Sequence, residues 1–322
     1  MLSTRRASTP RALLLLAAAF AIAPPGRGAA QQPAEGFALE RLQLAAPGAG
    51  WFVLDDIRQQ GGLGGGVSLS LGFADRPLEV HPRSGARGLD VVDAQGFMNV
   101  GLAVTYDRFR LHASFSSPLY VGGNGGVVDG WRFTAPSAGI ERTPDTISDV
   151  VVGVDARLLG DPTGAARLGT SVRLILPSGS RADYLSDDTV RAVGLVLLAG
   201  ESARYQYAAQ LGVHVRPLDE APVPDAPRGS ELLFGLAAGA RVAVGSRLLV
   251  VGPEVFGATA LRAPFGADAT ALEALLTGRY EAADGTGVRL KLGMGAGIHP
   301  RFGAAEWRAV VAVEANGALA RR

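Results

Sequence analysis

Residues 205–216, YQYAAQLGVHVR, decide the fold prediction for this chain, because their side chains alternate in character with a period of two. Such alternation places every second side chain on the same face of a β-strand. The apolar face would hold Tyr205, Tyr207, Ala209, Leu211, Val213 and Val215, and the other face Gln206, Gln210, His214 and Arg216. The stretch therefore predicts an amphipathic strand.

The length of this strand indicates what its apolar face contacts. Strands of soluble sheets usually have about five or six residues. A strand that crosses a bilayer at a tilt needs about nine to eleven, with apolar side chains toward lipid and polar ones toward a lumen. A run of about twelve alternating residues therefore favours a transmembrane strand.

Residues 1–30 have the features of a signal peptide. Basic residues such as Arg5 and Arg11 are followed by an apolar run of about ten residues over 13–23, and small residues end at Ala30. The run is too short to cross a membrane as a helix, which needs about 20 residues. We therefore predict export and cleavage after Ala30.

Charge and cysteine content exclude several classes of protein. Without residues 1–30 the chain has 27 basic and 30 acidic residues, and this slight acidic excess argues against nucleic-acid binding. The sequence has no cysteine, which excludes disulfides, thiolate metal sites and a lipid-modified cysteine. No cofactor or metal site is predicted.

The strand pattern repeats along the chain after Gly66. About twelve segments have the two-residue period, and no segment with a helical period competes with them. They are approximately residues 67–77, 97–106, 109–119, 148–159, 167–176, 189–199, 204–216, 231–244, 247–261, 271–282, 287–299 and 306–315.

The connections between these segments alternate between short and mostly longer. Short turns lie at 107–108, 160–166, 200–203, 245–246 and 283–286, and the loops at 78–96, 120–147, 177–188, 217–230, 262–270 and 300–305. This is the pattern of an up-and-down antiparallel barrel with turns in the periplasm and loops outside the cell. We predict an all-β transmembrane barrel of about 12 strands over residues 67–316, a tail at 317–322, and both termini on the periplasmic side.

The polar face of each predicted strand carries charges of both signs. Charge facing lipid would cost several kcal/mol at the bilayer midplane, so these residues are expected to line the lumen. The candidates are Arg110, His112, Asp155, Arg157, Arg173, Gln206, Gln210, His214, Arg216, Glu231, Arg241, Glu254, Glu273, Arg279, Arg289, Lys291, Arg308 and Glu314. Aromatic residues would form girdles, with Tyr106, Phe109, Tyr205 and Tyr280 near the short turns and Trp307 at the opposite rim.

Residues 31–66 precede the barrel and are a candidate plug. They contain Trp51 and Phe52, which could anchor the segment in the barrel mouth or at the membrane interface, and end in a glycine cluster that forms a flexible join. The glycine-rich loop 120–147 is a second candidate plug. A barrel of eight strands is packed solid and one of sixteen holds an aqueous channel, so the fate of a twelve-stranded lumen depends on what fills it.

Several stretches resemble a known family. They are FALERLQLAAPGAGWFVLDD (37–56), LPSGSRADYLSDDTVRA (176–192), VHVRPLDEAPVPDAPRGSELLFGLAAGARVA (213–243), LLVVGPEVFGAT (248–259) and GAGIHPRFGAAEWRAVVAVE (295–314). Together they resemble the N-terminal β-barrel part of OmpA-family outer-membrane proteins from myxobacteria. The resemblance implies a Gram-negative outer-membrane barrel. The family's periplasmic peptidoglycan-binding domain and the terminal aromatic residue of many bacterial barrels have no counterpart here.

No constellation of residues predicts catalysis. His112 shares a predicted face with Ser114 and Ser116, but nothing nearby in the sequence supplies the third group that a serine nucleophile and its base need. His81 and His299 each precede a proline and have no metal-ligand spacing around them. We predict that the protein is not an enzyme.

The predicted function is passive or weakly selective passage of small polar solutes across the outer membrane, with lumenal charges setting selectivity. The alternative is a closed structural or surface-display barrel that binds partners through its outer loops. A soluble secreted β protein would require the apolar faces to be buried. The expected partners are outer-membrane lipid and lipopolysaccharide, the barrel-insertion machinery and small polar solutes, without nucleic acid.

Overall fold

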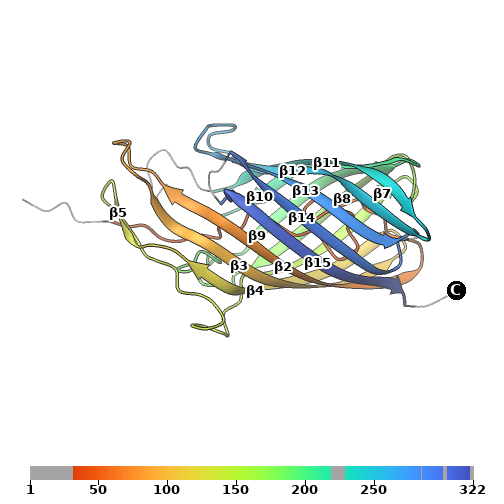
Figure 1. Ribbon diagram of the computed structural model, residues 1–322, viewed down its shortest axis with the longest axis horizontal. Helices are drawn as coiled ribbons and strands as arrows, with labels where there is room; N and C mark the ends of the chain where they lie inside the picture. Colours follow the sequence, from red (N-terminus) through yellow and green to blue (C-terminus); the bar gives the residue numbers. More distant parts are fainter. Residues whose placement is uncertain (1–31, 219–228, 284, 300–302, 320–322) are drawn as a thin grey trace, which may run out of the picture. The chain divides into compact units, whose positions relative to one another are not determined.

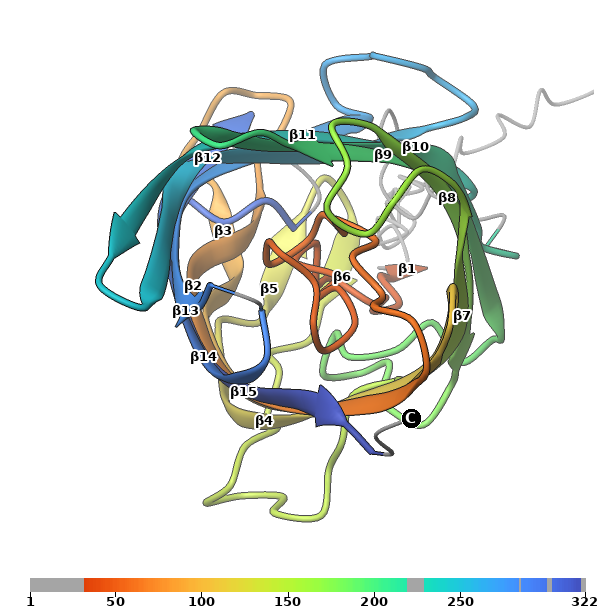
Figure 2. The same ribbon diagram turned by 90° about the vertical axis from the view of Figure 1, so that its right-hand side faces the viewer.

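Twelve strands close into an antiparallel barrel in the computed structural model, which describes residues 32–218, 229–283, 285–299 and 303–319 (Figures 1 and 2). The barrel strands are β2 (Leu63–Val80), β3 (Leu89–Tyr106), β4 (Phe109–Gly122), β7 (Val150–Leu159), β8 (Arg167–Leu176), β9 (Arg191–Glu201), β10 (Tyr205–Val215), β11 (Glu231–Val244), β12 (Arg247–Ala260), β13 (Thr270–Ala282), β14 (Gly287–His299) and β15 (Trp307–Ala318). Successive strands are neighbours, and β15 pairs with β2 to close the ring.

The predicted fold class and all twelve predicted strands are confirmed. The two-residue period identifies them because one face of each strand contacts the barrel interior and the other does not. β2 and β3 have 18 residues each and extend further than the alternation suggests. Three short strands form a separate sheet: β1 (Gln32–Pro33), β5 (Gly126–Val128) and β6 (Trp131–Phe133).

The two ends of the barrel differ in their connections. The end with the short connections, here the turn rim, includes the two-residue turns 107–108 and 245–246. Asp107 and Gly245 have φ angles of 52° and 61°, the left-handed conformation that tight hairpins use. The opposite end, here the loop rim, carries the longer loops and the small β1–β6–β5 sheet.

The outer surface of the barrel is apolar. Large side chains such as Leu111, Leu236 and Leu292 are more than 60% exposed. Tyr106, Phe109, Tyr205 and Tyr280 are exposed near the turn rim, and Trp307 is exposed near the loop rim, where its ring lies 5.1 Å from that of Phe73. No helix in the described ranges is long and apolar enough to cross a membrane.

Residues 34–60, here the inner segment, run through the lumen (Figure 2). Near the loop rim, Ala34 N–H donates to the Arg132 carbonyl at 2.8 Å. Near the turn rim, the Gln59 carbonyl accepts from Arg157 Nη2 at 3.1 Å. β2 begins at the turn rim and β15 ends there, as an even strand count predicts. The expectation that both chain ends lie on that side is wrong for the described start at Gln32, because the inner segment threads the lumen.

Candidate functional site

The candidate lumen residues form the inner wall of the barrel. All of the 18 are buried except Arg157 and Arg241, which are partly buried near the turn rim. Their strands alternate, so the side chains between them point outward. The wall does not face open water along its length, because the inner segment contacts much of it.

Three consecutive carbonyl oxygens of the inner segment accept hydrogen bonds from three cationic side chains of β13 and β14. The pairs are Ala49 with Arg289 Nη1 at 2.9 Å, Gly50 with Arg279 Nη1, and Trp51 with Lys291 Nζ at 3.1 Å. The same cations also pair with wall carboxylates, Lys291 with Glu314 at 2.6 Å and Arg279 with Glu281 at 3.0 Å. They are therefore held in place while they bind the segment.

The next three residues of the inner segment donate their backbone N–H groups to one wall carboxylate. Glu254 accepts from Phe52 at 3.1 Å, from Val53 at 2.6 Å and from Leu54 at 2.9 Å. The Thr277 hydroxyl donates to the same carboxylate at 3.0 Å. We call Glu254, Arg279, Arg289 and Lys291 the backbone clamp. These four side chains bind the main chain of residues 49–54. They therefore fix the register of this stretch through hydrogen bonds to its backbone.

Wall glycines make room for the large apolar side chains of the inner segment. A Cβ atom added at the glycine would lie 2.8 Å from Trp51 at Gly239, 2.8 Å from Phe52 at Gly293, 3.1 Å from Leu54 at Gly235 and 2.9 Å from Ile57 at Gly169. At such distances the added atom or its neighbour would have to shift, which costs free energy in a packed interior. The four hollows and the backbone clamp together make a wall shaped to this segment.

Two adjacent acids of the inner segment contact the wall beyond the backbone clamp. Asp55 pairs with Arg110, whose Nε also donates to Asp155 at 2.8 Å. Asp56 accepts from Gln206 Nε2 at 2.7 Å. The segment thus adds buried carboxylates to a wall that carries buried cations.

A second set of ion pairs holds the inner segment near the loop rim. Arg308 pairs with Glu40 at 2.9 Å and with Glu273 at 2.8 Å. Arg216 donates to Asp187 at 2.8 Å, and Asp187 also accepts from the Ala38 N–H at 2.7 Å. Burial opposes ionisation of Asp187, but the Arg216 guanidinium outweighs it and lowers the pKa of Asp187.

His112 has an acidic neighbour that was not predicted from the sequence. Its Nε2 lies 3.5 Å from Asp155 Oδ2, because β4 and β7 pair across a long loop. Ser116 Oγ instead accepts a hydrogen bond from Asn99 Nδ2 at 2.9 Å. Within the described residues, no serine hydroxyl bonds to His112, and no group of three or more His, Asp or Glu side chains is placed to hold a metal ion.

Several residues of the lumen were not among those predicted from the sequence. Glu281 lies two residues from Arg279 on the same strand face, so strict alternation could have found it. Asp55 and Asp56 carry a weaker signal, since adjacent acids after an apolar run also occur in surface loops. Nothing in the sequence marks Thr277 as a partner of Glu254.

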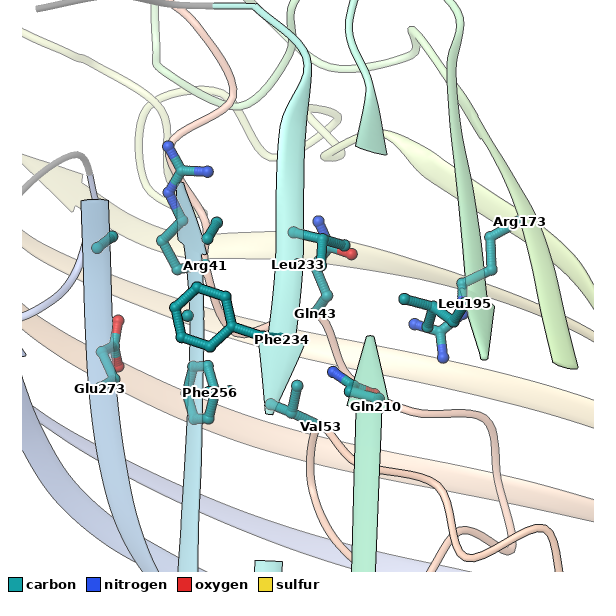
Figure 3. Close-up of a pocket in the computed structure, with 13 residues that line it drawn as sticks. Arg41, Gln43, Val53, Arg173, Leu195, Gln210, Leu233, Phe234, Phe256 and Glu273 are labelled. Carbon is teal, nitrogen blue, oxygen red and sulfur yellow. The ribbon is translucent and has the colours of Figure 1, made fainter. Parts of the chain in front are cut away.

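Small cavities remain on both sides of the residues held by the clamp. One of about 110 Å³ lies in the loop-rim half of the lumen and is lined by residues such as Asn99, Ser116 and Arg173. One of about 140 Å³ lies at the turn rim and is lined by residues such as Arg58 and Asn316. A third, of about 30 Å³, lies between Gln43 and Val53 of the inner segment and wall residues that include Arg173 and Gln210 (Figure 3).

No protein-family model and no curated protein matches the chain. Solved structures of similar fold include outer-membrane channels and porins. The crystal structure of the COG4313 outer membrane channel from Pseudomonas putida F1 has a TM-score of 0.52, covering 80% of this chain and 97% of that chain at 12% identity. A NanC porin structure has a TM-score of 0.47, covering 77% and 98% at 8% identity.

The first of these similarities supports the closed-barrel fold. The first structure is only 12% identical, so the similarity shows the fold and gives no information about a substrate of this chain. The resemblance to OmpA-family proteins is not supported by these comparisons and stays a prediction.

Proposed function

We propose that the protein is an outer-membrane channel for small polar solutes in which the inner segment restricts passage. The observation that carries the proposal is a closed barrel with an apolar exterior and a lumen wall charged with both signs. A wall of this kind suits hydrated polar solutes, because its charges replace part of the interaction with water. The similarity in fold to an outer-membrane channel supports the same proposal.

The proposed location is the outer membrane. Exposed side chains such as Leu111 and Leu292 would be costly in water over so wide a surface, and lipid or lipopolysaccharide would cover them. The barrel-insertion machinery would deliver the barrel there. A soluble secreted protein would have to bury these side chains, so their exposure counts against that alternative.

The inner segment is the proposed plug. Its clamp contacts lie between cavities of about 110 and 140 Å³, which hold small molecules rather than a wide water column. Passage would therefore be slow in the closed form and faster when residues 49–54 leave the backbone clamp. The selectivity would come from charged wall residues that the plug contacts, such as Arg279 and Glu254.

The density of these contacts favours one alternative. Buried ion pairs near the loop rim, such as Arg308 with Glu40, and backbone hydrogen bonds deeper in the lumen, such as Glu254 with Val53, could hold the lumen permanently closed. The barrel would then be a structural or display protein that binds partners through the loop rim.

Single-channel recording separates the two functions. The full-length protein would be expressed in a Gram-negative host, purified from its outer membrane and inserted into planar bilayers. We expect small discrete conductance steps for the wild type and clearly larger steps for a variant that lacks residues 32–57. Protease protection in liposomes would confirm insertion of both proteins.

Inserted wild-type protein without any steps would reject the open-channel proposal and favour the closed barrel. If the shortened variant conducts no more than the wild type, the inner segment is not the plug.

A further inference from the structure

Arg173 differs from the other buried cations of the lumen. It lies on β8, is 4% exposed, and donates from Nε to Ser171 Oγ at 3.2 Å. Its Nη2 is buried without a hydrogen-bond partner among the described residues. Guanidinium groups in protein interiors are normally matched to a carboxylate, a phosphate or backbone carbonyls, because a buried unpaired charge is costly.

Every other buried arginine or lysine of the described chain donates to a carboxylate or to a backbone carbonyl. Among the nearest examples, Arg191 pairs with Asp149 at 2.5 Å, and Arg167 donates to the Asp56 carbonyl at 3.0 Å. The complete set is Arg110, Arg167, Arg191, Arg216, Arg279, Arg289, Lys291 and Arg308. Arg173 thus has no hydrogen-bonded or ion-paired carboxylate among the described residues, and the carboxylate on which its charge acts, Asp155, is already paired with Arg110.

Arg173 borders two cavities of the lumen. It lines the cavity of about 110 Å³ and the one of about 30 Å³, and Gln43 of the inner segment also lines both. The two acids of the larger cavity each have a cationic partner, since Glu40 pairs through Oε1 with Arg308 and Asp149 pairs with Arg191, while Glu40 Oε2 accepts no hydrogen bond among the described residues. An anion that enters this space would therefore find Arg173 as its unmatched partner.

The rest of the lining indicates an organic anion rather than an inorganic one. The lining includes polar groups from Gln95, Asn99, Ser114 and Ser116. It also includes apolar side chains such as Leu42, Leu44, Phe97, Val151 and Ile175. At about 110 Å³ the space is smaller than the roughly 150 Å³ cavity that accepts benzene, so it suits an acid with a short apolar body.

We propose that Arg173 binds the carboxylate of a small organic acid in this cavity, at the loop-rim side of the inner segment. The guanidinium presents two parallel N–H groups to a carboxylate, and the apolar lining covers the acid's hydrocarbon part. This site deepens the proposed channel function and rests on it, because it would favour small organic anions among the polar solutes that enter the lumen.

Titration calorimetry of the full-length protein in detergent micelles tests the site directly. Propionate is the probe, propionamide is its uncharged counterpart, and inorganic phosphate is an anion without an apolar body. We expect the wild type to bind propionate and to bind the other two at least about tenfold more weakly. Equal binding of phosphate or propionamide would overturn the proposed ligand class.

Variants assign the binding to Arg173. Arg173→Gln removes the charge and should weaken propionate binding by about tenfold or more, while Arg173→Lys should restore part of it as a point charge. Arg108→Gln removes the same charge from an exposed turn and should leave binding unchanged. Wild-type protein that binds no propionate, or an Arg173→Gln variant that binds it as well as the wild type, would overturn the proposal.

Bilayer recording tests the channel function independently of ligand binding at Arg173. If the wild type conducts, a KCl gradient should give a reversal potential that shifts toward cation preference in Arg173→Gln and not in Arg108→Gln. A conducting protein with no such shift and no propionate binding rejects the site and leaves the channel. Propionate binding without conductance rejects the channel and leaves the site.

Discussion

Two regions of the same lumen are filled in different ways. Around the backbone clamp, the inner segment presents carbonyls, N–H groups and the acids Asp55 and Asp56, and the wall cations there are matched. Around Arg173, the segment presents Leu42, Gln43, Leu44 and Glu40, whose partner is Arg308, and the Arg173 guanidinium, beside a cavity, has no hydrogen-bonded carboxylate among the described residues. The wall strands alternate alike in both regions, so the local composition of the inner segment decides where the lumen is sealed.

The largest expected effect comes from removing the central acceptor of the clamp. Glu254→Ala leaves three N–H groups of residues 52–54 unsatisfied, at about 1–3 kcal/mol each. We expect the inner segment to detach, with a loss of roughly 3 kcal/mol or more in the free energy of unfolding. Urea titration measures this loss, and acrylamide quenching of Trp51 reports the detachment. Glu254→Gln keeps one acceptor oxygen and should have a smaller effect, and equal effects would mean that charge matters more than the hydrogen bonds.

A paired substitution compares the matched and the unmatched arginine. Arg110→Gln leaves two buried carboxylates, Asp55 and Asp155, without their arginine partner. It should lower the free energy of unfolding by about 3–5 kcal/mol. Arg173→Gln removes no hydrogen bond or ion pair from a carboxylate, since Asp155 keeps Arg110, and should change stability by less than about 1 kcal/mol. Urea titration of both variants makes the comparison. Similar losses would show that Arg173 is matched after all.

A single methyl group tests the fit of the glycine hollows. Gly239→Ala places a Cβ 2.8 Å from the Trp51 ring and 3.0 Å from the Val251 carbonyl oxygen, and overpacking of this kind costs about 1–3 kcal/mol. We expect lower stability and greater exposure of Trp51, measured by urea titration and fluorescence quenching. Gly194→Ala on β9 meets no atom within 4 Å and is the matched control. A control that destabilises as much would show that glycine loss in the wall, rather than contact with Trp51, causes the effect.

The smallest of the four expected effects is that acid lowers the stability of the loop-rim end of the inner segment. The pKa of Asp187 is lower in the folded protein than in the unfolded chain, because Arg216 outweighs the effect of burial. Its stabilisation is therefore complete above the unfolded value of about 4 and declines as the pH falls below it. Hydrogen exchange of residues near Ala38, corrected for intrinsic rates, should rise in acid. Asp187→Asn should remove this pH dependence, and its persistence would assign it to another group.

The sequence predicted the strands of the barrel wall far better than the path of the inner segment through the lumen. Alternation is a local property, so it correctly gave the strands and the buried positions of residues such as Arg173 and Glu254. The path of the inner segment has no period, because its backbone groups are bound by wall side chains that lie far away in the sequence. Glu254 meets Val53 across 201 residues of chain, and no spacing rule connects them. Which wall charge remains unmatched depends on that path, so the special position of Arg173 was also beyond the sequence.

The inner segment contacts wall residues that lie very far from it in the sequence, and this separation affects folding. Gly50 is 229 residues from Arg279, and Trp51 is 240 residues from Lys291, so the segment is synthesised first and its partners nearly last. Contacts of such high sequence separation form slowly, because a long loop must close before they are gained. The seam between β15 and β2 joins the two ends of the barrel strand series, and the inner segment lies inside the ring that this seam closes. Once that seam is paired, the segment is topologically enclosed and can leave only by sliding lengthwise along the barrel axis.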